Sequence, residues 1–547
     1  MNSASLTIPS LFNATLSAFP DATFLQYRQG EQIISLTYRE IGIAVDRLAI
    51  SLAQFGYKKG DRIALLAENS CEWVITYLAI VHAGCVVVPL DSIMPLPDIL
   101  HILDLSRSRL LFCSERFERL INGLPQPPKI PVERLGQFHS HRGSADSQEI
   151  RPELQNTDTA VVIYTSGTTG HSKGVVLSHE NLASNVLACG DVCEITKNDT
   201  FLLLLPLHHA FSSTVNMMLT MAVGARATLA TSYRSRDIVD DIRIGGVTVL
   251  VGVPQIFENI KNAMQSAVRT SDKVRRALFH TLKMISQVSG HAGLNLGDSL
   301  FGSLRRKSGL HCIRLMVSGG AALPTAVNRF FEAIGFILIQ GYGLTECSPV
   351  LCVNPPTKNK IGSVGPPLPG VNLRINNSNS EGIGEVWACG PNTMQGYDQN
   401  EAATREVLRD GWLNTGDAGY LDKDGYLYLT GRIKNVIVTP AGKNVYPEEL
   451  ESKLVSDPAI SAALILGVKR KERMGEKLCA LLKVDEEYMN SLPAAKSRTE
   501  IAEEVIRNYN QNSPSHQKIS EWQLLEGEFE KTSIGKIKRF LYNDYFK

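Results

Sequence analysis

The sequence predicts an α/β protein with a large N-terminal domain of helix-covered, largely parallel sheets, a small barrel-like antiparallel region and a small, mobile α+β C-terminal domain. Three observations support this prediction. Short apolar runs alternate with helix-like segments before about residue 370, and such alternation is typical of parallel sheets covered by helices. Turn-forming residues become frequent after that point. The chain has 547 residues, which exceeds the roughly 250–300 residues at which single cores stop growing.

The N-terminal elements follow one another as short apolar strands and longer helical runs. Pro254 directly follows an apolar run and favours a helix start, because proline is tolerated at the first helical position. We expect strands at 62–67, 85–88, 247–253, 313–317 and 336–340, and helices at 71–82, from Pro254 and at 324–334.

The remaining chain is rich in turn signals. The segments NNSNSEG (376–382), RDGW (409–412) and DKDGY (422–426) separate short strands such as 426–430, which fits an antiparallel region. A last unit then shows strands at 436–439, 460–468 and 477–484, with helices from Pro447 and at 499–509. We therefore predict one domain at 1–431 and a mobile domain at 432–547, which is a normal domain size.

Composition excludes several classes of protein. The chain carries 56 Lys and Arg against 55 Asp and Glu, so no overall charge points to nucleic acid. The first basic residue is Arg28, which excludes the basic start of a secretory signal, and no apolar run approaches the roughly 20 residues of a membrane span. Ten scattered cysteines include no CxxC pair, which favours reduced, buried thiols. We expect a cytoplasmic protein.

A flexible, polar segment directly follows the apolar run 160–163. Its sequence, YTSGTTGHSKGV (164–175), combines glycines, hydroxyl groups and Lys173. Consecutive backbone N–H groups in such a turn bind anions, so the segment has the chemistry of a phosphate-binding loop. The spacing GxxxxGK[ST] does not fit here, which excludes a Walker A loop. A flexible surface turn is the alternative.

A second segment, QGYGLTE (340–346), follows the expected strand at 336–340. Tyr342 between two glycines is placed to stack on a flat ring. Thr345 and Glu346 could meet a phosphate and its magnesium, since Mg²⁺ prefers hard oxygen ligands. A tight turn with a capping Thr and Glu is the alternative.

Two further segments carry a carboxylate and a lysine. Asp417 ends GWLNTGD (411–417) and could accept hydrogen bonds from ribose hydroxyls, while the guanidinium fork of Arg432 could add a bidentate contact. Lys536 lies in KTSIGKIKR (531–539) near the C-terminus. The alternatives are a hairpin-turn aspartate and a solvated basic tail.

Taken together with LPLHHAF (205–211) and SGGAAL (318–323), the order of these segments resembles the adenylate-forming superfamily of acyl-CoA synthetases, adenylation domains and luciferases. The resemblance covers nearly the whole chain. GSVGPPLPG (362–370), GKNVYPEELE (442–451) and the long stretch between Pro254 and Ser318 are similar to bacterial long-chain fatty acyl-CoA synthetases.

The resemblance implies a binding site for ATP and Mg²⁺. Gly320, Ala321 and Tyr342, the last between Gly341 and Gly343, shape the adenine site. Thr345 contacts the α-phosphate, Glu346 binds Mg²⁺, and Asp417 holds the ribose with Arg432. The mobile loop over the β- and γ-phosphates comprises Thr165, Ser166, Gly167, Thr168, Thr169, Gly170 and Lys173.

The resemblance also implies roles in catalysis and in domain motion. Lys536 bridges the reacting carboxylate and the α-phosphate, His209 guards the acyl site, and Lys434 is the interdomain hinge. Gly442 and Lys443 face the thiol acceptor, coenzyme A. Three residues depart from the family pattern without removing any of these groups: Ser172 and Ala322 stand where proline is usual, and Asn435 stands where aspartate is common.

The implied reaction activates a fatty, long-chain acid with ATP to an acyl-adenylate, releases pyrophosphate, and transfers the acyl group to coenzyme A with release of AMP. The alternatives within ligases are transfer to an acyl carrier protein and a fatty acyl-AMP ligase that stops at the adenylate. A luciferase-like oxidase shares every nucleotide motif, although the long-chain-type middle region favours a ligase. A non-catalytic nucleotide sensor should lack Glu346, Asp417 and Lys536, which are all present.

The stretch 261–314 predicts a surface contact. It carries ten Lys or Arg against two Asp, interleaved with apolar residues. Since fatty acids partition into membranes, we expect weak, peripheral contact with an anionic membrane at its inner face; a solvated helical face is the alternative. The residues expected to contact it are Arg275, Arg276, Arg305, Arg306 and Lys307.

Overall fold

A computed structural model describes most of the chain and divides it into two compact units. The described residues are 6–125, 127–137, 152–166, 172–291, 296–440, 443–469, 475–490, 496–531 and 537–546. The first unit comprises Met1–Leu323, Val327–Asn372 and Ala388–Leu413, and the second comprises Pro324–Ala326, Leu373–Trp387 and Asn414–Lys547.

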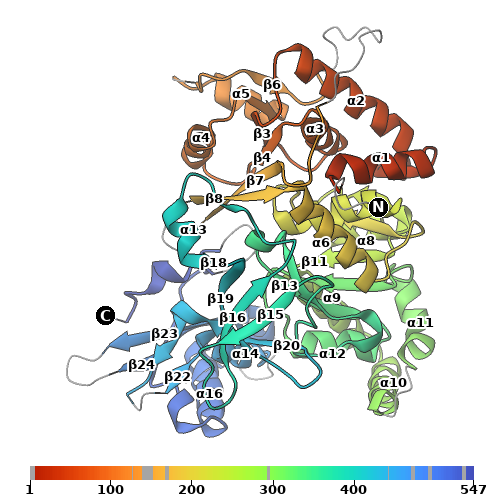
Figure 1. Cartoon of the computed structure of the whole chain (residues 1–547). Helices are drawn as coiled ribbons and strands as arrows, with labels where there is room; N and C mark the ends of the chain where they lie inside the picture. The colour runs from red at the N-terminus through yellow and green to blue at the C-terminus, as the bar shows by residue number, and fades with distance from the viewer. Residues whose placement is uncertain are drawn as a thin grey trace. The chain divides into compact units, whose positions relative to one another are not determined.

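A seven-stranded sheet in the first unit has the order β17-β8-β7-β4-β3-β5-β6. Its strands from β7 to β6 are parallel, whereas β8 runs antiparallel to both of its neighbours, β7 and β17. Apolar strands pack against α4 and α5 in one core (Figure 1). The elements are β3 (Arg62–Leu66), α3 (Cys71–His82), β4 (Val86–Pro89), α4 (Leu96–Leu105), β5 (Leu110–Cys113), α5 (Glu115–Asn122), β6 (Val132–Arg134), β7 (Thr159–Ser166), β8 (Ser172–Ser178) and β17 (Gly396–Tyr397).

An eight-stranded sheet in the same unit has the order β14-β13-β12-β11-β9-β10-β1-β2, with antiparallel pairs only at its two ends. Its strands are β1 (Thr23–Gln29), β2 (Gln32–Thr37), β9 (Thr200–Leu203), β10 (Arg226–Leu229), β11 (Val249–Gly252), β12 (Leu315–Ser318), β13 (Leu338–Gly343) and β14 (Val350–Val353).

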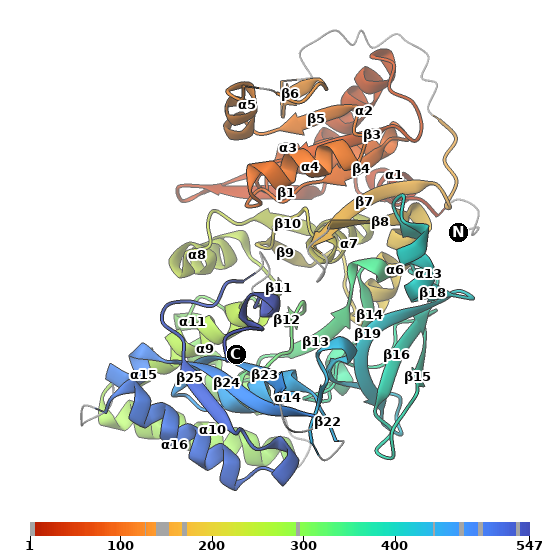
Figure 2. The same ribbon diagram turned by 90° about the vertical axis from the view of Figure 1, so that its left-hand side faces the viewer.

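Helices and one π-helix accompany this second sheet. Helices α9 to α12 lie together (Figure 1), with α9 and α11 beside β11 and β12 (Figure 2), and their apolar residues share a core with β9, β11, β12 and β13. The elements are α1 (Ile8–Ala18), α2 (Tyr38–Gln54), α6 (His179–Val192), the π-helix η3 (Ser212–Met218), α7 (Leu219–Val223), α8 (Ser235–Gly245), α9 (Pro254–Arg269), α10 (Lys273–His291), α11 (Gly297–Lys307) and α12 (Thr325–Ala333).

A five-stranded sheet and a C-terminal α+β region complete the chain. In the five-stranded sheet, β19 pairs antiparallel with both β18 and β20. Its strands are β15 (Asn372–Asn376), β16 (Gly384–Cys389), β18 (Leu408–Arg409), β19 (Trp412–Leu421) and β20 (Leu427–Arg432), with α13 (Glu401–Val407) before β18. The C-terminal elements are β21 (Ile437–Val438), β22 (Asn444–Val445), α14 (Pro447–Val455), β23 (Ile460–Lys469), β24 (Glu476–Val484), α15 (Glu486–Asn490), α16 (Arg498–Gln511) and β25 (Glu521–Leu524).

The structure bears on the predictions for the cysteines and for a membrane-spanning helix. All ten cysteines are free; eight are buried, and Cys312 and Cys389 are partly exposed. Burial raises the pKa of the Cys193 thiol to about 12, so the thiol is neutral near pH 7. Among the described residues, no helix is long and apolar enough to cross a membrane.

Candidate functional site

The predicted phosphate loop joins two paired strands of the first unit. Thr165 of β7 lies opposite Lys173 of β8, and Ser166 lies opposite Ser172. The Thr165 hydroxyl donates to the Lys173 carbonyl at 3.4 Å. The pairing therefore fixes both ends of the loop in sequence register, while the predicted residues Gly167, Thr168, Thr169 and Gly170 lie outside the described residues.

Tyr397 connects Lys173 to the predicted magnesium ligand. The Lys173 Nζ atom lies 4.9 Å from the centre of the Tyr397 ring, a distance suited to a cation–π interaction. The Tyr397 hydroxyl donates to Glu346 Oε1 at 2.8 Å. Tyr397 lies on β17, where it pairs with Val175 of β8. Side chains from three distant parts of the sequence therefore meet here.

One backbone contact and several side-chain contacts hold this arrangement. The Met394 N–H donates to the Glu346 carbonyl at 2.9 Å. The Tyr164 hydroxyl and the Arg62 guanidinium both contact the Asp398 carboxylate, with distances of 2.6–3.0 Å. Burial alone would raise the pKa of Asp398, but the hydrogen bonds from Arg62 and Tyr164 lower that pKa overall. A charged carboxylate thus anchors the residue after Tyr397.

The predicted adenine-site segments lie at the carboxyl ends of two neighbouring strands. β12 and β13 are parallel, with Ser318 opposite Gln340, so Gly320 and Ala321 follow one strand and Gly341–Gly343 end the other. This edge is where α/β sheets bind ligands. A Cβ atom on Gly343 would collide with the Pro349 carbonyl, which requires glycine there. Tyr342 is half-buried and lies opposite Cys352 of β14.

The segments 205–211 and 318–323 also meet. A Cβ atom on Gly319 would lie 2.6 Å from the Phe211 ring, so the ring packs directly on glycine backbone. Asn69 accepts from the Leu207 N–H at 2.9 Å and donates to the Leu205 carbonyl at 2.9 Å. The sequence had offered no reason to select Asn69, because its partners are more than a hundred residues away.

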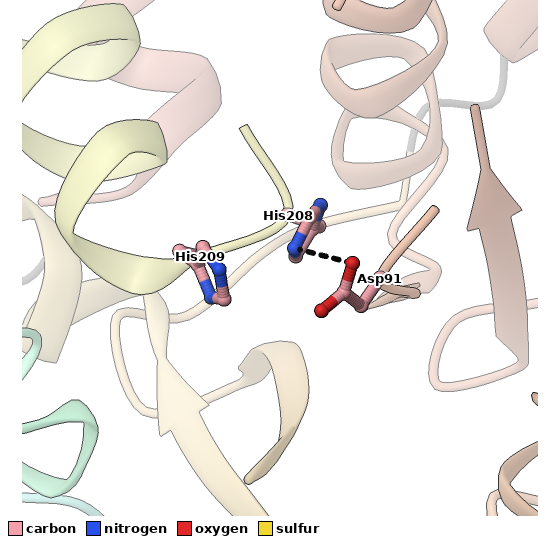
Figure 3. Close-up of side chains that lie close together, drawn as sticks. All are labelled: Asp91, His208 and His209. Atoms are coloured by element: carbon pink, nitrogen blue, oxygen red, sulfur yellow. Dashed lines mark ion pairs between the residues drawn. The ribbon is translucent and has the colours of Figure 1, made fainter. Parts of the chain in front are cut away.

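His209 lies in a cluster with His208 and Asp91 (Figure 3). His208 Nε2 is 3.3 Å from Asp91 Oδ1, and the two imidazole rings are 4.2 Å apart. Asp91 lies in the segment that follows β4 and the histidines lie in the segment that follows β9, so the two sheets contribute one side each. Burial, followed by the neighbouring His208, lowers the pKa of His209 to about 3. His209 is therefore a neutral ring at pH 7.

Side chains that could bind a metal lie both in the cluster of Asp91, His208 and His209 and at Glu346. One possible ligand atom from each of Asp91, His208 and His209 lies within 4.8 Å of the others; two imidazoles and a carboxylate suit Zn²⁺ better than Mg²⁺. Glu346 offers a hard carboxylate. It is half-buried and its Oε1 is oriented by Tyr397, so this residue fits the predicted magnesium ligand.

In the second unit, Asp417 and Arg432 lie directly opposite each other on β19 and β20. Arg432 Nε is 2.7 Å from Asp417 Oδ1, and the aspartate side chain is 9% exposed. The Asp417 N–H donates to the Thr415 hydroxyl, which in turn donates to the Val386 carbonyl. The sheet thus sets the direction of the carboxylate, and Arg432 supports it.

The predicted hinge follows β20. Lys434 is exposed and lies in a short 3-10 turn, Ile433–Asn435. The Asn435 amide donates to Glu448 of α14 at 2.5 Å; an aspartate there would place two carboxylates face to face. Lys443 lies in the turn between β21 and β22, where its backbone bonds to Thr439. Gly442 and Lys536 lie outside the described residues.

The prediction that Arg305 contacts a membrane surface is wrong. Arg305 is only 8% exposed. Its guanidinium donates to the carbonyls of Gly335 at 3.1 Å and Ile313 at 2.8 Å, and it pairs with Asp298. Arg305 therefore holds α11 against the turn after α12. Arg275, Arg276, Arg306 and Lys307 are exposed.

Comparison with known proteins gives a consistent result. Residues 12–398 match the family described as AMP-binding enzyme, and residues 434–547 match its C-terminal domain. The long-chain-fatty-acid–CoA ligase FadD15 of Mycobacterium bovis is 30% identical over 491 residues, covering 85% of this chain and 80% of that protein. The chloroplastic long-chain-fatty-acid–[acyl-carrier-protein] ligase AEE15 of Arabidopsis thaliana is 28% identical over 553 residues, covering 86% and 75%.

Solved structures share the fold. The ATP-bound RpMatB–BxBclM chimera B1 has a TM-score of 0.80 and 25% identity, covering 98% of this chain and 100% of that chain. The predicted fold class is therefore confirmed.

Proposed function

Because the chain belongs to the AMP-binding enzyme family, we propose that it activates a long-chain fatty acid with ATP and transfers the acyl group to coenzyme A. Adenylate-forming acid–CoA ligase activity is the broader class to which the family and the relatives point. The contact of Tyr397 with both Lys173 and Glu346 carries the proposal, because it gathers a cation and a metal-binding carboxylate beside the adenine-site strands.

The chemistry has two steps at one site. An acid oxygen attacks the α-phosphorus of ATP, the bond to the pyrophosphate oxygen breaks, and an acyl-adenylate forms. The thiolate of coenzyme A then attacks the acyl carbon, and AMP leaves. We assign Lys173 to the leaving phosphates and Lys536 to the charge at the α-phosphate, since fixed cations stabilise charge that develops in the transition state. Bound Mg²⁺, held by Glu346, would neutralise further phosphate charge.

We also assign residues to the ribose and to the acyl chain. The buried Asp417 carboxylate, fixed by β19 and paired with Arg432, suits the ribose hydroxyls. His209 is neutral near pH 7, as its lowered pKa shows, and an uncharged ring is suited to border an apolar acyl chain. Two relatives whose names specify long-chain fatty acids support the proposed substrate class.

The acceptor has a specific alternative. One relative is named for transfer to an acyl carrier protein, so a carrier-bound thiol is the second candidate. Because long-chain acids partition into bilayers, we further propose that the enzyme contacts an anionic membrane peripherally.

An acid panel tests the proposal directly. The purified full chain is supplied with Mg-ATP, acids of graded chain length and an aromatic acid, and either coenzyme A or a carrier protein bearing phosphopantetheine. We expect pyrophosphate, AMP and acyl-CoA with long-chain acids above all. Preference for an aromatic or short acid, or thioester only on the carrier protein, would contradict it.

Two variants separate the steps. Lys536→Ala should lose adenylate formation and largely keep thioester formation from a supplied acyl-adenylate. Glu346→Gln should lose Mg²⁺-dependent pyrophosphate release. Equal loss of both half-reactions in Lys536→Ala would contradict the role given to Lys536.

A further inference from the structure

Helix α10 presents large apolar side chains to solvent. Val274, Leu278, Met284, Ile285 and Val288 are each between 42% and 76% exposed. These five residues are called the α10 face here. An exposed apolar residue is ordinary when it is single, but five on one helix form a patch, and contiguous apolar patches mark interaction sites.

The spacing places these side chains on one side of the helix. Val274, Leu278, Ile285 and Val288 follow the offsets i, i+4, i+11 and i+14, which return to the same face at 3.6 residues per turn. An adjoining side of α10 packs inward: Phe279 lies 5.5 Å from the Phe301 ring of α11, and Leu282 borders the core. An ordinary surface helix has one apolar face that it buries, whereas the apolar residues of α10 extend beyond its buried side onto an exposed one.

The Lys and Arg residues of α10 have no acidic residue beside them within the helix. The sequence has no Asp or Glu between Asp272 and Asp298. Lys273 and Arg275 flank Val274 at about 100° on either side, and Arg276 is exposed in the same first turn of the helix, about 160° from Val274 around its axis. Arg275 pairs with Asp272 at 3.2 Å, so Lys273 and Arg276 supply most of the unbalanced charge.

Apolar side chains flanked by cations match one kind of surface. We propose that the α10 face docks on an anionic lipid bilayer, with its apolar side chains at the headgroup boundary and the flanking Lys273 and Arg275 among the lipid phosphates. A second copy of the chain would present the same cations with no acidic partner in α10, which disfavours self-association through this face. α10 lies beside α9 and α11 in the first unit (Figure 1), so docking leaves the eight-stranded sheet untouched.

The biological purpose of this docking surface rests on the proposed function, because a lipid-soluble acid is concentrated in the bilayer. The binding of the protein to vesicles can nevertheless be measured without any enzymatic turnover. The surface also replaces the expected set of contacts: Arg305 is buried, and the apolar residues of α10, which the charge count did not reveal, carry the interaction.

Vesicle co-sedimentation of the full chain tests the proposal. The probes are phosphatidylcholine vesicles with and without phosphatidylglycerol, at low and high salt. The apolar variant changes Val274, Leu278, Ile285 and Val288 to Ser, and the charge variant changes Lys273, Arg275 and Arg276 to Gln. The matched control changes three exposed apolar residues elsewhere in the first unit, Ile43, Phe55 and Leu120, to Ser.

We expect the wild type and the control to bind anionic vesicles at low salt. The apolar variant should retain less than a tenth of the binding, and the charge variant should lose the dependence on salt and on phosphatidylglycerol. No wild-type binding, or equal binding by the apolar variant, would overturn the proposal. A concentration-dependent dimer that disappears in the apolar variant would also overturn it and assign the face to a second copy.

Activity measurements keep this result apart from the enzymatic assignment. Adenylation of a water-soluble acid in the absence of vesicles should be the same in the wild type and the apolar variant. Vesicle binding without ligase activity would refute the proposed function alone, whereas ligase activity without vesicle binding would refute the docking surface alone.

Discussion

Tyr397 contacts two of the residues to which the proposed function assigns the nucleotide phosphates and their metal. Its hydroxyl orients Glu346 and its ring receives Lys173, so one side chain serves a carboxylate and a cation. Because the ring and the hydroxyl act on different partners, the two functions can be removed separately.

Tyr397→Phe should raise the Mg²⁺ concentration needed for half-maximal pyrophosphate release about tenfold or more. The physical reason is that a hydrogen bond to a charged group contributes about 1.5–3 kcal/mol. Tyr397→Leu, which also removes the ring, should in addition raise the KM for ATP through Lys173. The measurement is pyrophosphate release as a function of Mg²⁺ and ATP.

Tyr27→Phe on β1 is the matched control, since it removes a partly exposed hydroxyl from the same unit. An unchanged Mg²⁺ dependence in Tyr397→Phe, with lower thermal stability instead, would assign Tyr397 a structural role only.

The sequence predicted Lys173, Tyr342 and Glu346 as site residues because each lies in a compact, polar, glycine-containing segment. Tyr397 carried no such local signal: it is 51 residues from Glu346 and reaches it only through pairing of β17 with β8. Asp91 and Asn69 were missed for the same reason. Contacts that form only in the tertiary structure cannot be predicted from local composition.

At the scale of elements, prediction succeeded where local signals agreed. The helix expected at 71–82 is α3, Cys71–His82, and its Ser70 cap accepts from the Trp73 N–H at 3.1 Å. The expected helix start at Pro254 and the strands at 460–468 and 477–484 are also confirmed. The surface helix within the basic stretch was more difficult to predict. Apolar residues of α10 extend from its buried side onto its exposed side, so the helix lacks the narrow apolar face that indicates a surface helix.

The packing of α11 gives an element-scale prediction. A Cβ atom on Gly297, the first residue of α11, would lie 2.6 Å from the Gly335 backbone nitrogen. Since backbone cannot move aside as a side chain can, Gly297→Ala should destabilise the protein by about 1–3 kcal/mol and lower the melting temperature.

Gly302→Ala in the same helix is the control. A Cβ atom there meets nothing within 4 Å among the described atoms, and alanine favours helices by up to about 1 kcal/mol over glycine. It should therefore raise the melting temperature slightly. Opposite shifts in calorimetry support the close backbone contact, and equal shifts would argue against it.

At the scale of the whole molecule, the two half-reactions need different groups near the same α-phosphate and acyl carbon. Lys536 serves the first step and the segment of Lys443 the second, by the roles proposed above, and both belong to the C-terminal region that matches its own family from residue 434. A domain boundary at 431/432 remains a prediction from the change in sequence pattern. The proposal requires rotation between the steps, and the short 3-10 turn Ile433–Asn435 is where the chain would turn.

Lys434→Pro tests that rotation. Proline fixes φ near −65°, which should block a change of backbone angle at residue 434 while leaving the adenylation groups of the first unit in place. Pyrophosphate release in the presence of acid and Mg-ATP should persist, whereas acyl-CoA formation should fall at least a hundredfold. Lys434→Ala keeps the backbone free and is the control for loss of the side chain. Single-turnover measurements of adenylate and thioester distinguish the two steps: wild-type thioester formation in Lys434→Pro would place the hinge elsewhere, and equal losses in both variants would assign the effect to the lysine side chain.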